Sequence, residues 1–183
     1  MLPEDLEPFR AELIQEEREE AKKDAEKERL GLVMYTDGSR LKSLAAGYTV
    51  AWENGHIWEG IKTHLGYNQE AFDAECAALA RALESASRPD TISTNHHFTD
   101  AQVAIRRMAS DEPGPGQKYA LEARKHIATL QQAVSGITIE VRWCPAYEGV
   151  EGNKKADEWA KLAADEPDTQ GVKGLEWTTY SDQ

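Results

Sequence analysis

A chain of 183 residues, of which 40% are hydrophobic and 30% are charged, is long enough for one domain of ordinary size with additional segments at its ends. This composition excludes a fibrous or wholly disordered protein. The net charge of −12 is concentrated in residues 1–30, with −5, and in residues 165–183, with −4, so the nearly balanced centre neither requires nor excludes a nucleic-acid partner.

The cysteines and the apolar runs exclude further classes. Cys76 and Cys144 are too few for a disulfide framework and have no partners at zinc-binding spacing, so we interpret them as reduced, buried thiols. No apolar run approaches the roughly 18 residues of a membrane span, and the start of the chain lacks the basic and then apolar order of a signal peptide. We therefore expect an intracellular protein, in the cytoplasm or the nucleus, without a membrane partner.

Residues 1–30 are predicted to form a charged helical extension or linker. Apolar residues up to Leu13 recur at helical spacing, and the sequence from Gln15 to Arg29 is then almost entirely charged. This pattern is typical of a solvated helix that joins a domain to a larger polyprotein or faces a partner. We predict one domain over residues 31–166, followed by an acidic tail over residues 167–183.

Three consecutive antiparallel strands are predicted after this extension. Leu32–Tyr35 is apolar and ends at Asp37–Ser39, a sequence that by itself is more typical of a hairpin turn than of a functional site. Ala46–Trp52 and Ile57–Leu65 are rich in β-favouring residues, and Glu53–His56 between them has the composition of a hairpin turn.

A helix and a fourth strand are predicted next. Glu70–Ser87 has apolar residues on one face, and Glu75 lies near its start. Thr91–Thr99 is a predicted strand that runs directly into Asp100. Its middle, Asn95–His97, is unusually polar for a central strand, and its adjacent histidines would point to opposite faces and could not easily chelate one metal ion. We interpret these polar residues as structural or edge residues.

The second half completes an α/β pattern. Helices are predicted over Asp100–Met108 and Tyr119–Ala133, a strand over Ile137–Trp143, and a last helix over Asn153–Ala164, with Asp157 in its first turns. The order predicts a mixed sheet of five strands, three antiparallel and then two parallel, flanked by helices.

Four carboxylates fall at corresponding places in this pattern. The first and fourth strands can lie side by side, so that Asp37 and Asp100 emerge at the same edge of the sheet, where Glu75 and Asp157 can reach in from flanking helices. Four crowded acids repel one another unless divalent cations neutralise them, and such oxygen ligands select magnesium or manganese. Two such ions about 3.5–4 Å apart are suited to hydrolysis of a phosphodiester.

Four short motifs carry a resemblance to a known family. They are YTDGS at Tyr35–Ser39, FDAE at Phe72–Glu75, FTDAQ at Phe98–Gln102 and WCPAYEGVEGNKKAD at Trp143–Asp157. Over about residues 30–167 this set resembles ribonuclease H of type 1, and within that family it is most similar to the C-terminal domain of fungal non-LTR retrotransposon reverse transcriptases. The resemblance implies an RNase H-like fold and hydrolysis of the RNA strand of RNA–DNA hybrids.

The resemblance also implies a role for each matching residue. Asp37 matches the acid that bridges two Mg²⁺ ions (with Mn²⁺ as a substitute), Asp157 the acid on the side of the nucleophile, and Glu75 with Asp100 the pair on the side of the leaving group. The positions that match substrate-contacting residues of the family are Gly38, Ser39, Gln102 and Asn153.

One departure bears on catalysis. Tyr147 stands where the family usually has a catalytic histidine on a mobile loop, and a tyrosine is neutral near pH 7 and could not carry a proton in the same way. We expect slower turnover or weaker hybrid affinity than in cellular relatives. The alternative is a catalytically weakened or decayed domain that serves as a nucleic-acid-binding or protein-interaction module. A DNA-directed or integrase-like nuclease would use three acids and gains no support from Trp143–Asp157.

Overall fold

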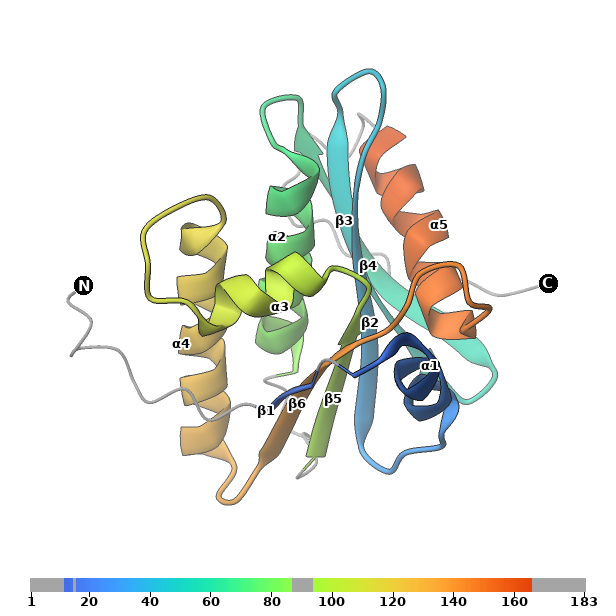
Figure 1. Cartoon of the computed structure of the whole chain (residues 1–183), viewed down its shortest axis with the longest axis vertical. Helices are drawn as coiled ribbons and strands as arrows, with labels where there is room; N and C mark the ends of the chain where they lie inside the picture. The colour runs from blue at the N-terminus through green and yellow to red at the C-terminus, as the bar shows by residue number, and fades with distance from the viewer. Residues whose placement is uncertain (1–11, 15, 87–93, 166–183) are drawn as a thin grey trace.

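The computed structural model describes residues 12–14, 16–86 and 94–165. Six strands form one sheet in the order β1-β6-β5-β2-β3-β4 (Figure 1). Their bounds are Glu12–Ile14 for β1, Leu32–Arg40 for β2, Ala46–Asn54 for β3, Ile57–Gly66 for β4, Thr94–Thr99 for β5 and Thr138–Trp143 for β6. β2, β3 and β4 are antiparallel neighbours, whereas β5, β6 and β1 continue the sheet in parallel. The α/β mixed architecture is confirmed, but the predicted number of five strands is wrong.

Helices cover both faces of the sheet. Their bounds are Arg18–Glu26 for α1, Ala71–Ser85 for α2, Gln102–Ala109 for α3, Gln117–Ala133 for α4 and Glu151–Asp165 for α5. α2, α3 and α4 lie on one side, and α5 and α1 lie on the other (Figure 1). Among the described residues, no helix is long and apolar enough to cross a membrane.

The sixth strand comes from the N-terminal segment. The helix predicted over residues 1–30 is wrong at Glu12–Ile14, which pairs in parallel with β6, and right at α1; the residues before Glu12 lie outside the described part. β6 would otherwise end the sheet with unpaired backbone groups, which favour the addition of a strand. The helical spacing of Leu13 could not reveal this pairing, because the partner, Val141, is distant in the sequence.

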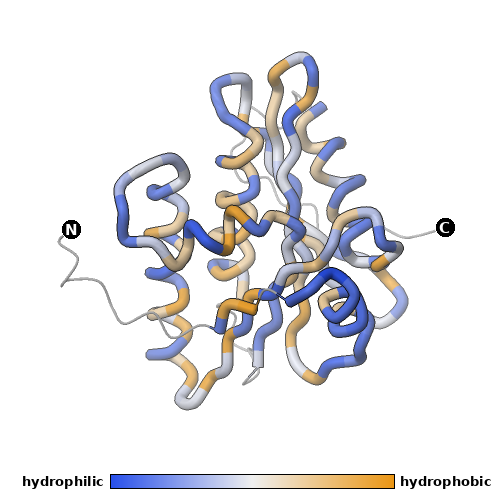
Figure 2. The backbone as a smooth tube through the Cα atoms, viewed as in Figure 1, coloured by the Kyte–Doolittle hydropathy of each residue, from blue (hydrophilic) through white to orange (hydrophobic). Residues whose placement is uncertain are grey.

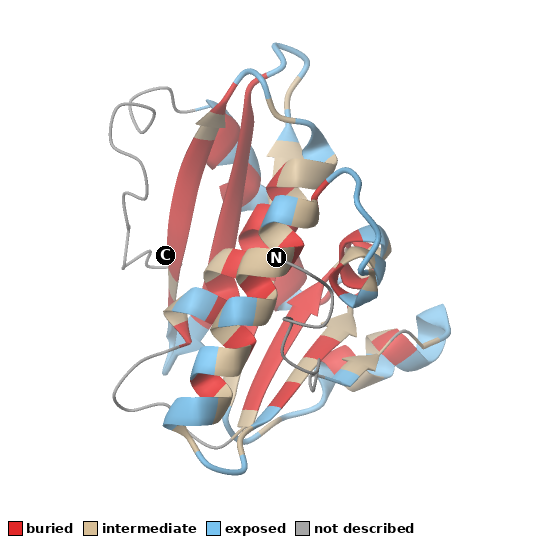
Figure 3. Cartoon of the chain, turned by 90° about the vertical axis from the view of Figure 1, so that its left-hand side faces the viewer, coloured by how far each residue is buried: buried red, intermediate tan, exposed pale blue. Residues whose placement is uncertain are grey.

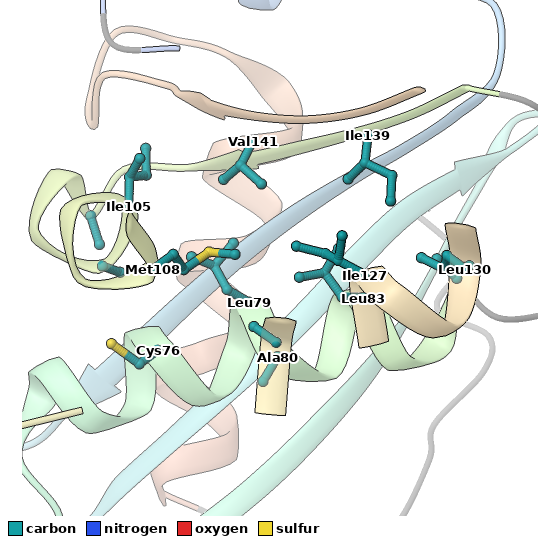
Figure 4. Packing of buried hydrophobic residues seen from close by; sticks show 14 residues of the cluster. Cys76, Leu79, Ala80, Leu83, Ile105, Met108, Ile127, Leu130, Ile139 and Val141 are labelled. Atoms are coloured by element: carbon teal, nitrogen blue, oxygen red, sulfur yellow. The ribbon is translucent and has the colours of Figure 1, made fainter. Parts of the chain in front are cut away.

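The main core lies between the sheet and the layer of α2, α3 and α4. Figure 4 shows the side chains of Leu79 and Leu83 of α2 facing Ile127 of α4, with Ile139 and Val141 of β6 beside them. The buried strands run through the middle of the molecule (Figure 3). This layer therefore holds the first turns of α2 and α3, which flank the sheet edge, in fixed positions.

The alternation along β2 assigns its side chains to the two layers. Met34 packs with Ala82 of α2, whereas Tyr35 packs in the opposite layer, where its ring lies against Gly152 of α5. A Cβ atom at position 152 would overlap the Tyr35 ring, so the close approach of α5 to β2 requires glycine there. Because side chains alternate along a strand, Asp37 faces the same layer as Tyr35.

The polar residues of β5 are buried in the middle of the sheet rather than at an edge. His96 Nδ1 lies 2.6 Å from a carboxylate oxygen of Glu140 on β6, which in turn contacts the Arg142 guanidinium. Burial, and then the neighbouring His96, lowers the pKa of the fully buried His97 to about 3, so His97 is neutral at physiological pH. The structural interpretation of these residues is confirmed for His96, and the interpretation as edge residues is wrong.

Candidate active site

Asp37 and Asp100 lie beside each other where two parallel strands stop pairing. The ladder between β2 and β5 ends at the pair Thr36 and Thr99, and each of these threonines is followed directly by an aspartate. The predicted turn at Asp37 is wrong, because β2 continues in its pairing with β3 as far as Arg40. Asp37 is therefore an internal strand residue with a side chain only 5% exposed.

Glu75 and Asp157 approach this sheet edge from the two helical layers. The backbone at Ala74 and Glu75 of α2 lies so near Gly38 that a Cβ atom there would be 2.5 Å from the Glu75 nitrogen. Asp157 is in the second turn of α5, and its Oδ2 accepts a hydrogen bond of 2.9 Å from Lys161 one turn later. Glu75 and Asp157 thus come from opposite layers, and both are near enough for their charges to act on Asp37.

The electrostatics of the carboxylates show how closely they interact. The pKa of Asp37 is raised to about 9. Burial is the largest cause, and the negative charges of Asp100, Asp157 and Glu75 add to it. Burial, followed by the charge of Asp100, raises the pKa of Glu75 to about 7. The pKa of Asp100 is also raised, first by burial. Such a cluster holds protons at neutral pH unless cations replace them.

Hydrogen bonds from neighbouring residues reach both Asp37 and Asp100. The buried side chain of Asn153 donates from Nδ2 to Asp100 Oδ2 at 3.3 Å, and the Trp143 indole donates to the backbone carbonyl of Asp100 at the same distance. The Gly38 amide donates to Asp37 Oδ1 at 2.9 Å. Asn153 is thus placed beside Asp100, whereas its predicted contact with substrate stays a prediction.

Two neighbours of the site were missed by reasoning from the sequence. The alternation of β6 predicts only that Trp143 ends a covered strand, and gives no sign of its bond to the Asp100 carbonyl. Lys161 could have been found, because it follows Asp157 by four residues on a predicted helix, and that spacing brings opposite charges together.

A hollow of about 410 Å³ opens beside Asp100 and Asp157. It is lined by Asp100, Ala146, Tyr147, Gly149, Val150, Asn153, Lys154, Asp157 and Glu158. Tyr147 lies at its rim with 88% of its surface exposed and a φ of 61°, a left-handed conformation that non-glycine residues rarely adopt. The hollow is therefore open to a large substrate.

The other predicted substrate-contacting residues lie at the same end of the sheet. Gly38 and Ser39 continue β2 beyond Asp37, paired with Tyr48 and Gly47 of β3. Gln102 is the first residue of α3 and is partly exposed. The structure thus brings these positions near the carboxylates, and their contacts with substrate stay predictions.

The donor set fits divalent cations. In the described part of the chain, no group of three or more histidine, cysteine or acidic side chains is placed so that it could hold a metal ion as it stands. The chemistry of the cluster nevertheless favours cations, because Asp37, Glu75 and Asp100 all have raised pKa values and present only oxygen ligands. A divalent cation bound there would offset both the burial of these charges and the repulsion between them, which together raise these pKa values.

The fit between β2 and α2 gives a first prediction. We expect Gly38→Ala to lower the free energy of unfolding by about 1–3 kcal/mol, because the new methyl group must push the start of α2 away from β2. Glu75 would move with it, so any metal-dependent activity should fall on the order of 10- to 100-fold. Urea unfolding and an assay at a temperature where the variant is folded would measure the two effects. Unchanged stability would contradict the close contact.

The comparisons with known proteins agree with this arrangement. The RNase H family model matches residues 29–165. A search among curated protein sequences finds no match. The matched range includes all four carboxylates and Tyr147, and it begins after α1.

Several solved structures share the fold. RNase H1 from the halophilic archaeon Halobacterium salinarum NRC-1 is 21% identical, with a TM-score of 0.56 over 73% of this chain and 97% of that chain. LC11-RNase H1 in complex with an RNA/DNA hybrid is 22% identical, with a TM-score of 0.54 over 73% of this chain and 96% of that one. The prototype foamy virus protease-reverse transcriptase is 19% identical, with a TM-score of 0.52 over 76% of this chain and 21% of the viral chain.

Proposed function

Because this chain belongs to the RNase H family, we propose that it hydrolyses the RNA strand of RNA–DNA hybrids, with divalent cations held by Asp37, Glu75, Asp100 and Asp157. The observation that carries this proposal is the gathering of three acids around the buried Asp37, where burial first, and then the charges of Asp100, Asp157 and Glu75, raise the pKa of Asp37 to about 9. Such crowding of ionised acids destabilises the fold unless cations neutralise them, and perturbed carboxylates of this kind are typical of functional sites. The hybrid bound to LC11-RNase H1 supports the substrate class.

Each residue at the site would have its own role in this reaction. Asp37, Asp157, Glu75 and Asp100 would hold the cations, each in the role that the resemblance to the family implies for it. When bound, two such cations supply an activated water and stabilise the leaving oxygen. Asn153 would keep the Asp100 carboxylate in the orientation needed for binding. Ser39 and Gln102 would face the nucleic-acid backbone, where contacts to 2′-hydroxyl groups distinguish RNA from DNA.

We further propose that the domain is part of a retroelement reverse transcriptase. The similarity to the reverse-transcriptase structure of prototype foamy virus supports this context, and so does the resemblance of the four motifs to fungal non-LTR elements. A domain within such a polypeptide would receive its hybrid from the polymerase that makes it.

A direct assay tests the activity. The purified chain is incubated with an RNA–DNA hybrid labelled on the RNA strand, with magnesium, with manganese or with a chelator. Double-stranded RNA, double-stranded DNA and single-stranded RNA of the same sequence serve as matched substrates. We expect metal-dependent cutting of the hybrid alone. Hybrid binding without cutting in either metal would contradict the enzyme and favour the binding module.

A substitution at position 147 tests whether this residue limits turnover. We expect Tyr147→His to raise kcat by roughly tenfold, because a histidine can carry a proton near neutral pH, where a general acid or base contributes about 100-fold or more when ideally placed. Tyr147→Asn is the matched control, because asparagine also tolerates the left-handed backbone at φ 61° but does not titrate. An equal gain in both variants would show that removal of the tyrosine, and not proton transfer, is responsible.

A further inference from the structure

The segment formed by β1 and α1 precedes the family match but contacts the loop that carries Tyr147. The match begins at residue 29, whereas the two elements span Glu12–Ile14 and Arg18–Glu26. In Figure 1 the blue α1 lies against the orange loop between β6 and α5. The 144–150 loop, residues 144–150, connects β6 to α5.

α1 contacts residues at the start, the middle and the end of the 144–150 loop. Arg18 Nη1 donates to Glu148 Oε1 at 2.8 Å, and the Arg18 guanidinium lies 5.8 Å from the centre of the Trp143 ring. Ala25 is buried in one cluster with Phe98 and with Cys144 and Val150 of the loop. α1 is mostly hydrophilic (Figure 2), but its two alanines, Ala21 and Ala25, are buried. The helix therefore contacts the loop at Cys144, Glu148 and Val150.

The segment is itself fixed to the sheet. Arg142 of β6 contacts Glu16 at 3.3 Å and Asp24 at 3.7 Å, so one guanidinium joins both the residue before the N-cap of α1 and the last turns of α1 to the strand that leads into the loop. The parallel pairing of β1 with β6 adds backbone hydrogen bonds. α1 is thus a fixed support rather than a tail that follows the loop.

The loop separates the carboxylates from a second hollow. Gly149 and Val150 line both the hollow of about 410 Å³ beside Asp100 and Asp157 and another of about 660 Å³, which has side chains of α1 in its wall. The loop also contains Tyr147 at φ 61° and Gly149 at φ 78°. A left-handed conformation at a tyrosine persists only where neighbouring structure holds it. The contacts from α1 are in the right place to do so.

We propose that the β1–α1 segment holds the 144–150 loop in its position against the carboxylates, with Arg18 as a positioning residue for Tyr147. The consequence for catalysis rests on the proposed function, but the support of the loop does not. The segment would then be part of the functional unit, although it lies outside the family match.

Amide hydrogen exchange of the loop tests this support in the full chain. We expect Arg18→Ala to speed exchange of the loop amides about twofold to fivefold, the range for one exposed ion pair, and Ala25→Glu to speed it about tenfold or more by placing a charge in the buried cluster. The control is Lys23→Ala, which removes an ion pair with Glu20 inside α1 and should leave the loop unchanged. Amides of β3 report global unfolding.

Rescue and kinetics distinguish positioning from general stability. Exchanging the charges in Arg18→Glu with Glu148→Arg should restore slow exchange, and each single change alone should not. In hybrid cleavage, Arg18→Ala should lower kcat, while KM and the melting temperature stay close to those of Lys23→Ala.

Each outcome decides one claim. Unchanged loop exchange in both Arg18→Ala and Ala25→Glu would overturn the proposal. Faster exchange with an unchanged kcat in an active enzyme would overturn the positioning role. Faster exchange in a chain that cleaves no hybrid would support the contact between α1 and the loop, and would reject the proposed function instead.

Discussion

Asp37→Asn is expected to lower the kcat/KM of hybrid cleavage by on the order of 100- to 1,000-fold or more, because in the proposed function the Asp37 carboxylate helps to hold the cations. The control is Asp165→Asn, which removes the same charge from an exposed position at the end of α5. Cleavage rates with magnesium and with manganese would be measured for both. Cleavage by Asp37→Asn within a few-fold of the unmodified chain would contradict the bridging role.

The same variant should be more stable than the unmodified chain when no metal is present. The folded-state pKa of Asp37 is about 9 against an ordinary value of 3.8, so the carboxyl takes up a proton on folding between these two pH values. The free energy of unfolding therefore falls as pH rises through this range. Asparagine does not titrate, and we expect a gain of about 2–4 kcal/mol at pH 8 and almost none at pH 4.

Urea unfolding in a chelator at pH 4, 6 and 8 would measure this difference. Loss of activity together with a gain of stability is the signature of a site that is crowded for function. A variant that is less stable at pH 8 would show instead that the Asp37 carboxylate supports the fold.

Magnesium or manganese should stabilise the folded chain, and more strongly at higher pH. A cation at 100 times its Kd adds about 2.7 kcal/mol to the free energy of unfolding. Protons compete for the same oxygens, because the pKa of Asp37 is about 9 and that of Glu75 is about 7, so affinity should rise as pH increases from 6 to 8. Each proton released contributes up to about tenfold in affinity per pH unit.

Thermal unfolding with and without metal at pH 6 and 8 would show this dependence. Calorimetric titrations in two buffers of different ionisation enthalpy would count the protons released. The comparison variant is Glu75→Gln, which should release fewer protons between pH 6 and 8. An equal rise in melting temperature at both pH values would contradict competition between cations and protons.

The sequence by itself determined the chemistry-bearing residues and most of the elements. The alternation of β6 and the helical periodicity of α2 and α5 are local patterns that result from which side chains meet the core. Asp37 and Asp100 directly follow the last paired residues of two parallel strands, and because such strands are commonly neighbours, their proximity could be predicted. The resemblance of the motifs to RNase H was likewise sufficient to identify the family.

Only the tertiary structure decided which distant segments complete the site. β1 is three residues long and exists because β6 presents an unpaired edge, and the continuation of β2 through Asp37 depends on its pairing with β3. Two further contacts join distant parts of the chain: Gly38 packs against the start of α2, and Arg18 contacts Glu148. In neither case does the local sequence indicate which residue will be the partner. Periodicity records burial one element at a time, whereas edge pairing and close packing depend on the position of a second element.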